Sequence, residues 1–435
     1  MKRTRFYMTI KGMAAGCLLA LCTWPVAAQK QQFALDKCIE MALKNNTEVK
    51  NARLEVEVAD EDRKYAFTQI FPQISAMGAG FVGAKDLMRG QMEVPQMGAM
   101  PLSMIKKGVV ATLTALQPLY MGGQVINANK MAELQREVRH LEFEMTEKDV
   151  IQNVHDYYWQ LVALRGNIAT LEAAEKQLNE VYGLTKKFVD AGVTTRNDLL
   201  RVELKKQETA SQRLKLDNGI EVIRLLLAQL CGADMMTFDI ESKNILTPPM
   251  PETFFVQTDQ ALGNREEIEM TEKVVDLNAL QVKMERGKNL PTVAVGAAGL
   301  YYNMMEDNQG NLVGLATVSV PISGWWSGSH KIRKAKLALE QSRNKLRDTK
   351  DKLAIEIITS WNALEEAYAQ IEIARQSVEQ ANENLRLSRD QYNAGTMDMT
   401  ELLDAVTLHT QSHSALTSAC ADYQKRIAEY QRKTR

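Results

Sequence analysis

The chain has 435 residues, of which 25% are charged, and its 53 basic and 54 acidic side chains leave a formal net charge of −1. A protein that binds nucleic acid presents a basic face, and this balance gives no support to that class of function. Only ten residues are proline. Beyond the N-terminus, no apolar segment is long enough to cross a membrane as a helix.

Residues 1–28 have the pattern of a secretory signal peptide. Basic residues precede the apolar run MAAGCLLALC, and Val26 and Ala28 are the small residues of a cleavage site. A membrane anchor, the first alternative, needs about twenty apolar residues. The sequence AAGC, ending at Cys17, loosely matches a lipoprotein site, but the apolar region before it is short, so lipidation ranks second to cleavage.

Three cysteines follow the signal peptide: Cys38, Cys231 and Cys420. Their odd number and wide separation do not fit a disulfide framework. We therefore expect structural, unpaired thiols.

The mature chain contains two copies of one structural unit. Residues 29–231 form the first copy. Its elements are, in order, a helix near 35–70, strands near 72–82 and 108–119, a long helix at 124–190, a hairpin tip near 192 and a helix at 196–231. The segment between the two strands, 82–108, has the pattern of a long loop.

That loop is rich in methionine: Met88, Met92, Met97, Met100 and Met104. Thioethers favour Cu(I), so one interpretation is a copper site. The alternative is a flexible extracellular loop that binds no metal. The sequence does not decide between them.

A proline-rich segment, 232–252, is predicted to connect the two copies at mid-height. Residues 253–435 form the second copy, with a helix, strands near 291–303 and 312–321, a long helix, a tip near 395 and a last helix. Matched residues reveal the duplication: Pro72 aligns with Pro291, Pro118 with Pro321, and Gly192 with Gly395.

The second long helix, Ser329 to Asn393, has a coiled-coil seam. Apolar residues recur every seven positions, with one step of four: Ile332, Leu339, Leu346, Leu353, then Ile357, Leu364, Ile371, Val378, Leu385 and Tyr392. A helix of about 65 residues is roughly 100 Å long, longer than a compact domain. We expect it to lie along other helices.

The strands near 108–119 and 312–321 alternate with period two over about ten residues, the pattern of tilted transmembrane β-strands. A soluble antiparallel hairpin packed on a helix is the alternative. Four strands cannot close a barrel, and an open sheet edge cannot lie in lipid. If the strands span a membrane, the protein must therefore oligomerise.

Both tips pair a glycine with acidic residues. Gly192 and Gly395 suit the left-handed position that ends a helix. Thr195 with Asp198, and Asp398 with Glu401, have the spacing of a capping box. Asp404 lies one turn further on and is not explained as a cap.

The duplicated order of these motifs resembles the TolC-like outer-membrane efflux protein family, also called outer membrane factors. The motifs are the AL openings of both copies, FPQIS and LPTVAV, QPLYMGG and VPISGWWSG, and the paired AG breaks. The resemblance implies a mainly α fold with a small β part. Three protomers would form a 12-stranded outer-membrane β-barrel, four strands from each, continued by a long periplasmic α-helical coiled-coil barrel.

The resemblance also implies a set of site residues. Glu401 and Asp404 would face the pore at its narrowest point, where threefold symmetry gives six carboxylates that attract cations and respond to pH. Asp198, Tyr392 and Met397 would make tip and gate contacts. Residues at the adaptor-docking positions are Gly192, Val193, Gly395 and Thr396.

One position departs from the family pattern. Where the best-known member has an arginine that holds the carboxylate matching Asp198, this chain has Met397. The closing salt bridge therefore cannot form in the same way, although Arg196 lies near enough in sequence to replace it.

The predicted function is that of an outer-membrane channel in a Gram-negative bacterium, with most of its mass in the periplasm. It would conduct small molecules such as drugs, received from a periplasmic adaptor protein and an inner-membrane transporter of the RND or ABC type. The alternatives are the exit duct of type I protein secretion and a soluble periplasmic coiled-coil scaffold. We expect no enzyme activity, cofactor or metal. The substrate and the particular pump and adaptor are left open.

Overall fold

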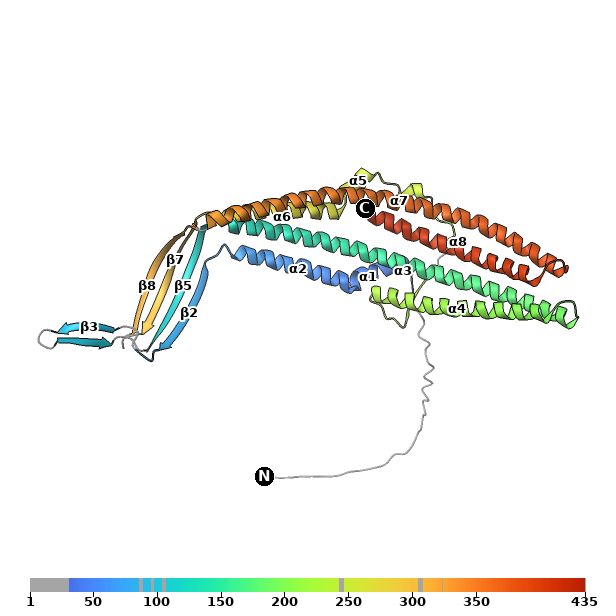
Figure 1. Cartoon of the computed structure of the whole chain (residues 1–435), viewed down its shortest axis with the longest axis horizontal. Coiled ribbons are helices and arrows are strands. Elements are labelled where there is room, and N and C mark those ends of the chain that lie inside the picture. The colour runs from blue at the N-terminus through green and yellow to red at the C-terminus, as the bar shows by residue number, and fades with distance from the viewer. Residues whose placement is uncertain are drawn as a thin grey trace, which may run out of the picture.

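The computed structural model describes residues 31–85, 89–94, 98–103, 107–241, 246–303, 308–322 and 324–434. The signal peptide, Cys17 and three of the loop methionines, Met88, Met97 and Met104, lie outside these residues. The molecule is elongated, with a β-sheet at one end and two helical hairpins at the other (Figure 1).

Long helices and the strands before them make up most of the chain. The elements of the first copy are β1 (Gln31–Phe33), α1 (Leu35–Asn45), α2 (Thr47–Thr68), β2 (Gln73–Val82), β3 (Arg89–Val94), β4 (Gly98–Ser103), β5 (Lys107–Met121), α3 (Gln124–Asp190) and α4 (Arg196–Leu230). Those that follow are β6 (Phe238–Ile240), η1 (Pro251–Phe254), α5 (Thr258–Gly263), α6 (Glu266–Gly287), β7 (Thr292–Asn303), β8 (Asn308–Ser319), α7 (Gly324–Asn393) and α8 (Met399–Thr434).

The first helix of the chain is broken, whereas the sequence predicts one continuous helix near 35–70. Asn46 adopts extended dihedral angles between α1 and α2, and its side-chain oxygen accepts hydrogen bonds from the backbone N–H groups of Glu48 and Val49. Asparagine is a strong N-cap residue because its side chain satisfies these otherwise unpaired donors. The chain therefore ends one helix and starts the next within a single residue.

The segment 82–108 was expected to be a loop, and this prediction is wrong in part. It contains the antiparallel pair β3–β4, in which Met92 lies opposite Met100 and Gln91 lies opposite Pro101. A two-stranded ribbon has two outer edges, so a proline that cannot donate a hydrogen bond is accommodated in it. The hairpin extends beyond the main sheet (Figure 1).

The main sheet has the antiparallel order β2–β5–β7–β8. Directly paired residues lie on the same face. One row across the sheet is therefore Ala76, Leu113, Gly299 and Leu312, and the next is Ile74, Ala115, Ala297 and Gly314. These two rows are apolar from edge to edge, whereas the row at the far end of the same face includes Asn303 and Asn308.

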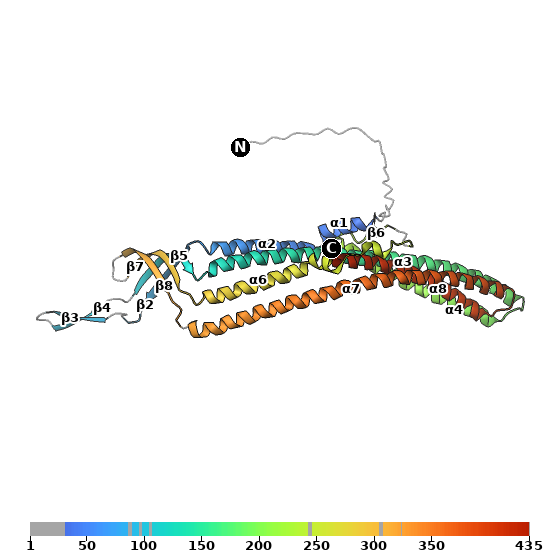
Figure 2. The same cartoon turned by 90° about the horizontal axis from the view of Figure 1, so that it is seen from above.

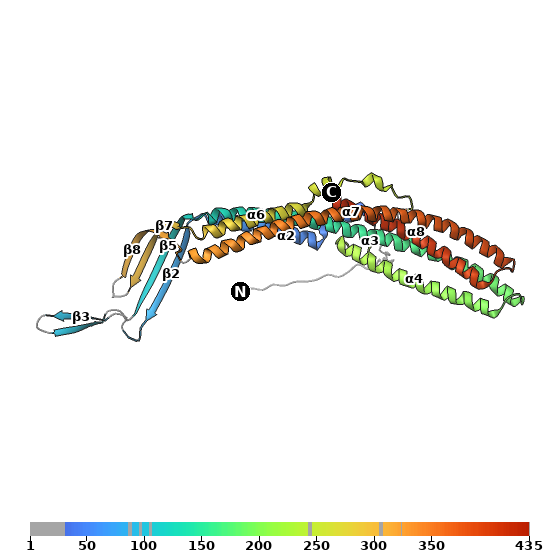
Figure 3. The same cartoon turned by 45° about the horizontal axis from the view of Figure 1, so that its top comes forward.

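The opposite face of the sheet carries polar side chains. Its rows include Met77, Thr112, Leu300 and Asn311, and also Ser75, Thr114, Ala298 and Val313. No described helix packs on either face to the extent that helices pack on one another. Figure 3 shows the sheet lying beyond the ends of the helices. Apolar side chains consequently remain exposed, among them Ile74 (72%) and Leu312 (77%).

The helices form one layer of antiparallel coiled coils, in two halves that follow one another along the long helices. In the half near the sheet, α3 packs against α2 and α6, and α7 packs against α6. In the distant half, α3 packs against α4 and α8, and α7 packs against α8. Each long helix therefore runs past two shorter helices arranged end to end (Figures 1 and 2).

The seam of α7 is buried along its second half. Leu353, Ile357, Leu364, Ile371, Leu385 and Tyr392 are buried, whereas Ile332, Leu339, Leu346 and Val378 are half-buried. Small residues beside the seam, including Ala367, Ala374 and Ser360, are also buried. A small side chain at each turn lets α8 approach α7 closely.

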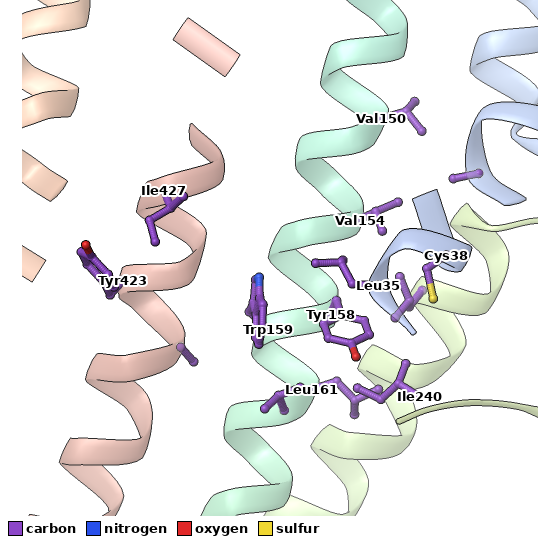
Figure 4. Packing of buried hydrophobic residues seen from close by; sticks show 14 of the residues in the cluster. Leu35, Cys38, Val150, Val154, Tyr158, Trp159, Leu161, Ile240, Tyr423 and Ile427 are labelled. Atoms are coloured by element: carbon purple, nitrogen blue, oxygen red, sulfur yellow. The ribbon is translucent and has the colours of Figure 1, made fainter. Parts of the chain in front are cut away.

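The largest core lies at mid-height, where both copies meet. Tyr158, Trp159 and Leu161 of α3 pack with Cys38 of α1, Ile240 of β6, and Tyr423 and Ile427 of α8 (Figure 4). The parallel pair β1–β6 ties the start of the first copy to its end. None of the described helices contains a stretch that is both long and apolar enough to span a bilayer.

Candidate functional site

The tips of the two helical hairpins form the candidate site, at the end of the molecule farthest from the sheet (Figure 1). The first tip joins α3 to α4 and the second joins α7 to α8. Gly192 and Gly395 are matched positions of the two copies, and they lie 203 positions apart in the sequence.

Both tips reverse the chain through the same backbone geometry. Gly192 and Gly395 have φ angles of 73° and 74°, in the left-handed region. Val193 N donates to Phe188 O at 2.8 Å, and Thr396 N donates to Gln391 O at 3.0 Å. These bonds from the second residue after the helix satisfy a free carbonyl and define a Schellman motif. The left-handed glycines that the sequence predicts are confirmed.

The helices that leave the tips are capped by the predicted residues. The hydroxyl of Thr195 accepts a hydrogen bond from Asp198 N, and the Asp198 carboxylate accepts one from Thr195 N, which completes a capping box. At the second tip, Asp398 Oδ1 accepts from Glu401 N at 3.0 Å. Asp398 is thus a cap, as the sequence indicates.

Asp198 is held by threonines. Its Oδ2 accepts hydrogen bonds from Thr194 Oγ1 at 2.5 Å and from Thr195 Oγ1 at 2.9 Å. The bond from Thr194 is the main cause that lowers the pKa of this carboxyl below its ordinary value, with smaller contributions from Thr195 and the charge of Arg201. Asp198 therefore carries a stabilised negative charge without the family arginine.

A hydrophobic core joins the two tips. Tyr392 is 6% exposed and packs with Leu178 and Val181 of α3, Val202 of α4 and Leu403 of α8. Its hydroxyl lies 3.3 Å from Thr185 Oγ1, which is itself fully buried, and its ring lies 6.1 Å from that of Phe188. Tyr392 is thus a contact between the hairpins.

Two polar contacts join the hairpins at their surface. Arg389 Nη2 donates to Glu180 Oε2 at 2.6 Å, which links α7 to α3, and Arg201 on α4 donates to the Thr400 hydroxyl on α8. Arg196, which the sequence suggested as the replacement cation, is exposed. The arginine that reaches across to the second hairpin is Arg201.

Sequence reasoning missed Arg201, Arg389 and Thr185. These contacts join residues 199, 209 and 207 positions apart, close to the repeat offset. Equivalent segments of the two copies therefore lie side by side. A search for polar residue pairs separated by about the repeat offset would have found these contacts.

Glu401 and Asp404 lie on one exposed face of α8. Leu402, Leu403, Ala405 and Val406 between and beside them are buried in the tip core. Both carboxylates therefore point away from the protomer's own core. The matching positions of the first copy are Asp198 and Arg201, so only the second copy carries two acids there.

The outermost part of both tips is open to solvent. Gly192, Gly395 and Thr396 are exposed, and Val193 has 69% of its surface exposed. A Cβ atom added to either glycine would meet nothing within 4 Å. Met397 is half-buried.

The described residues contain no group of three or more histidine, cysteine or acidic side chains that could hold a metal ion. His409 and His413 pack ring against ring at 4.5 Å, and His413 Nε2 lies 3.1 Å from Asn382 Oδ1. Burial lowers the pKa of both histidines. These contacts account for the pair as part of the α7–α8 packing.

A sheet with apolar rows across one face, with no described helix packed on it and continued by long coiled coils, is typical of a membrane channel protein with a helical extension. Comparison with known proteins identifies the class further. The chain matches the family described as outer membrane efflux protein over residues 38–233 and 258–431. The chain belongs to this family and is a channel of the outer membrane.

Individual relatives are distant in sequence but similar in fold. The proteases secretion protein PrtF of Dickeya chrysanthemi is 21% identical over 384 residues, covering 84% of this chain and 80% of PrtF. The outer-membrane channel OprN has a TM-score of 0.77 at 16% identity, with 92% of this chain and 89% of OprN covered. CmeC of Campylobacter jejuni has a TM-score of 0.76 at 16% identity, with 99% and 94% covered.

Proposed function

We propose that three copies of this chain assemble into an exit channel for small molecules. The observation that supports this assembly is the combination of an apolar sheet face and two unpaired sheet edges. β2 and β8 are the outer strands, so their outward backbone groups have no partner in the sheet. In lipid, such groups must be paired, and closure of the sheet is the way to pair them. Three protomers supply twelve strands, joined by β8 of one protomer to β2 of the next.

The helical part has matching open edges. α7 forms one edge of the helical layer, and α2 and α4 form the other. Exposed apolar residues follow both edges: Ile355, Ile358 and Ile373 on α7, and Leu54, Val58, Leu204 and Leu214 on α2 and α4. Burying them between neighbouring protomers removes apolar surface from water, which stabilises the assembly.

In this proposal the tips are the periplasmic entrance. Gly192, Val193, Gly395 and Thr396 are exposed at the end of the molecule and would contact a periplasmic adaptor protein. The adaptor would join the channel to an inner-membrane pump of the RND or ABC type. The location in the outer membrane supports this arrangement, because the helices extend far from the sheet that lies in lipid.

We further propose that Glu401 and Asp404 form a cation-selective, pH-sensitive gate. Both carboxylates are exposed on the face of α8 opposite the tip core. Threefold symmetry would bring six of them around the axis, where they attract cations and repel anions.

Recording of single channels in planar bilayers tests this gate. The Glu401→Gln/Asp404→Asn variant should lose most of its preference for cations and its block by divalent cations. A control with the same loss of charge is Asp190→Asn/Glu379→Gln, because both of these carboxylates are exposed and lie on α3 and α7. Unchanged selectivity in the gate variant, or an equal loss in the control, would reject the gate assignment.

Protein secretion is the second candidate function. It is favoured by the similarity to PrtF, a protein named for protease secretion, over most of both chains. Deletion of the gene separates the two candidates. A drop in resistance to small toxic compounds supports efflux, whereas loss of one secreted protein with unchanged resistance supports secretion.

A further inference from the structure

Two of the three cysteines of the mature chain meet at mid-height. Cys38 lies on α1 and Cys231 is the C-cap residue of α4. Both are fully buried and are free thiols in this structure, as the sequence predicts, and Cys231 Sγ lies 3.5 Å from the backbone oxygen of Cys38. They belong to the same core cluster, which also contains Tyr158 and Ile240 (Figure 4).

The backbone around the two cysteines is held in place independently. Asn45 Nδ2 donates to Cys231 O at 3.3 Å, and Asn46 Nδ2 donates to Leu230 O at 3.1 Å. Gly232 has a φ of 60°, and a Cβ atom there would lie 2.5 Å from Cβ of Asn45. The end of α1 is thus in direct contact with the end of α4. Cys38 lies about two turns earlier on α1, and its own contact with Cys231 is the one from Sγ to the Cys38 backbone oxygen.

The location of the protein supplies the second observation. The channel resides in the outer membrane. In the proposed arrangement its helices lie in the periplasm, the compartment in which exported proteins fold. Disulfides form and persist in this oxidising compartment, whereas cytosolic thiols stay reduced. Two adjacent cysteines in an exported protein are therefore exposed to oxidation while the chain folds.

We propose that Cys38 and Cys231 form a disulfide bond in the exported protein. The bond joins residues 193 positions apart and encloses α2, the strands β2 to β5, α3 and all of α4. It staples the start of the first copy to its end, next to the β1–β6 pair that makes the same connection without a covalent bond.

The oxidant is the disulfide of an exported thiol oxidoreductase. The thiolate of one cysteine attacks a sulfur of that disulfide, forming a mixed disulfide and releasing one oxidoreductase thiolate. The second cysteine thiolate then attacks the sulfur of the first, forming the Cys38–Cys231 bond and releasing the other thiolate. The two protons lost by the cysteines convert the released thiolates to thiols, so the protein loses two electrons and the oxidoreductase gains them.

The timing of this reaction follows from burial. The hydrogen bond with Cys38 is the largest cause that raises the pKa of the Cys231 thiol, and burial is the second. A buried thiol with a raised pKa is a poor nucleophile. The bond must therefore form before α1 packs on the end of α4, and in the folded protein reductants reach it only when the chain opens on heating.

Mass spectrometry of the full-length protein from outer membranes tests the proposal. Cells are lysed in denaturant with an alkylating reagent and no reductant, and the digest is searched for joined peptides. The expected result is one pair of peptides, containing Cys38 and Cys231, joined with the loss of two hydrogen atoms. Cys420 should carry the alkyl group. Alkyl groups on both Cys38 and Cys231 would overturn the proposal.

Two measurements separate the bond from simple packing. In the Cys38→Ala variant, Cys231 should become fully alkylated, whereas the Cys420→Ala variant should retain the joined peptides. Wild-type protein should unfold several degrees lower when reductant is present during heating, because a long closed loop restrains the unfolded chain. The Cys38→Ala/Cys231→Ala variant should show no such shift, and an equal shift in that variant would contradict the assignment.

Discussion

At the scale of single residues, the charge on Asp198 illustrates how the tip replaces a missing contact. In the best-known member of the family an arginine holds the matching carboxylate. In this protein, Thr194 and Thr195 donate hydrogen bonds to it. Hydrogen bonds to an ionised carboxylate are stronger than bonds between neutral groups. Met397 is consequently compatible with a well-held Asp198.

The pH dependence of stability should report this charge. The pKa of Asp198 is lowered in the folded protein, so the folded state favours the ionised form. Its contribution is fully present above the ordinary value of about 3.9 and is lost as the pH falls through the lower folded value. We expect the stability advantage of wild type over Asp198→Asn, measured by thermal unfolding, to be constant near neutral pH and to vanish in acid. The Thr194→Val variant removes the main donor and should weaken this pH dependence; an unchanged profile would argue against the assignment.

Residue types at the tips were readable from sequence because their roles are local. A helix that ends with a residue in the left-handed conformation favours glycine there. A capping box requires Asp or Thr at the cap, three residues before its partner. Arg201 and Arg389 were not readable in this way. Their partners, Thr400 and Glu180, are about 200 residues distant in sequence, and only the packing of one copy against the other brings them together.

At the scale of elements, polar contacts between the ends of α7 and α3 add to the packing of α3 on α8 that ties the two hairpins. Tyr392 of α7 meets Thr185 of α3 in a buried hydrogen bond, and Arg389 pairs with Glu180 one turn away. The hairpins must separate here if the channel entrance widens. These contacts therefore oppose opening.

Removal of the tyrosine hydroxyl should loosen this contact without leaving a cavity. Loss of the Tyr392–Thr185 hydrogen bond in Tyr392→Phe should cost about 1 kcal/mol, in the range of a typical hydrogen bond. We expect a several-fold increase in the fraction of time that single channels spend in the more conductive state. The control is Tyr65→Phe, because Tyr65 on α2 is 69% exposed. Equal gating in wild type and Tyr392→Phe would exclude this contact as a restraint.

The element pattern was predictable where periodicity is strong and failed where it is weak. The seam from Ile357 to Tyr392 repeats over five heptads, so a long coiled-coil helix is the natural interpretation. The β3–β4 hairpin has short strands interrupted by Pro101 and Gly98, and this composition resembles a loop. The break at Asn46 is one residue wide, below the resolution of a periodicity argument.

At the scale of the whole molecule, the apolar face of the sheet is the feature that determines its environment. Leu312 and Asn311 are adjacent on β8 and lie on opposite faces, because successive side chains of a strand alternate. Leu312 shares its row with Ala76, Leu113 and Gly299, whereas Asn311 shares its row with Met77, Thr112 and Leu300. In the proposed channel, the first face meets lipid and the second faces the interior.

A pair of lysine substitutions tests which face meets lipid. Leu312→Lys should cost about 2–4 kcal/mol, the range for a cation on the lipid face near the bilayer midplane. Asn311→Lys should be tolerated, because a polar interior accepts charge. The measurement is the amount of heat-stable assembly recovered from outer membranes, and equal recovery of the two variants would contradict the assignment of faces.

The sequence predicts oligomer formation from a simple physical constraint. Four strands leave two open edges, and this count was already available in the sequence. The structure adds that α7 forms one edge of the helical layer, with α2 and α4 at the other. The alignment of one protomer's edge with that of the next depends on side chains from both protomers. Neither the sequence pattern nor one protomer alone determines it.

The most direct test of the account is the native mass of the complex extracted from outer membranes in mild detergent. Closure of the four-stranded sheet by three protomers predicts a single species with three times the mass of the mature chain. It also predicts that this species disperses to monomers only on heating. A monomer or dimer as the sole species under the same conditions would contradict the threefold channel.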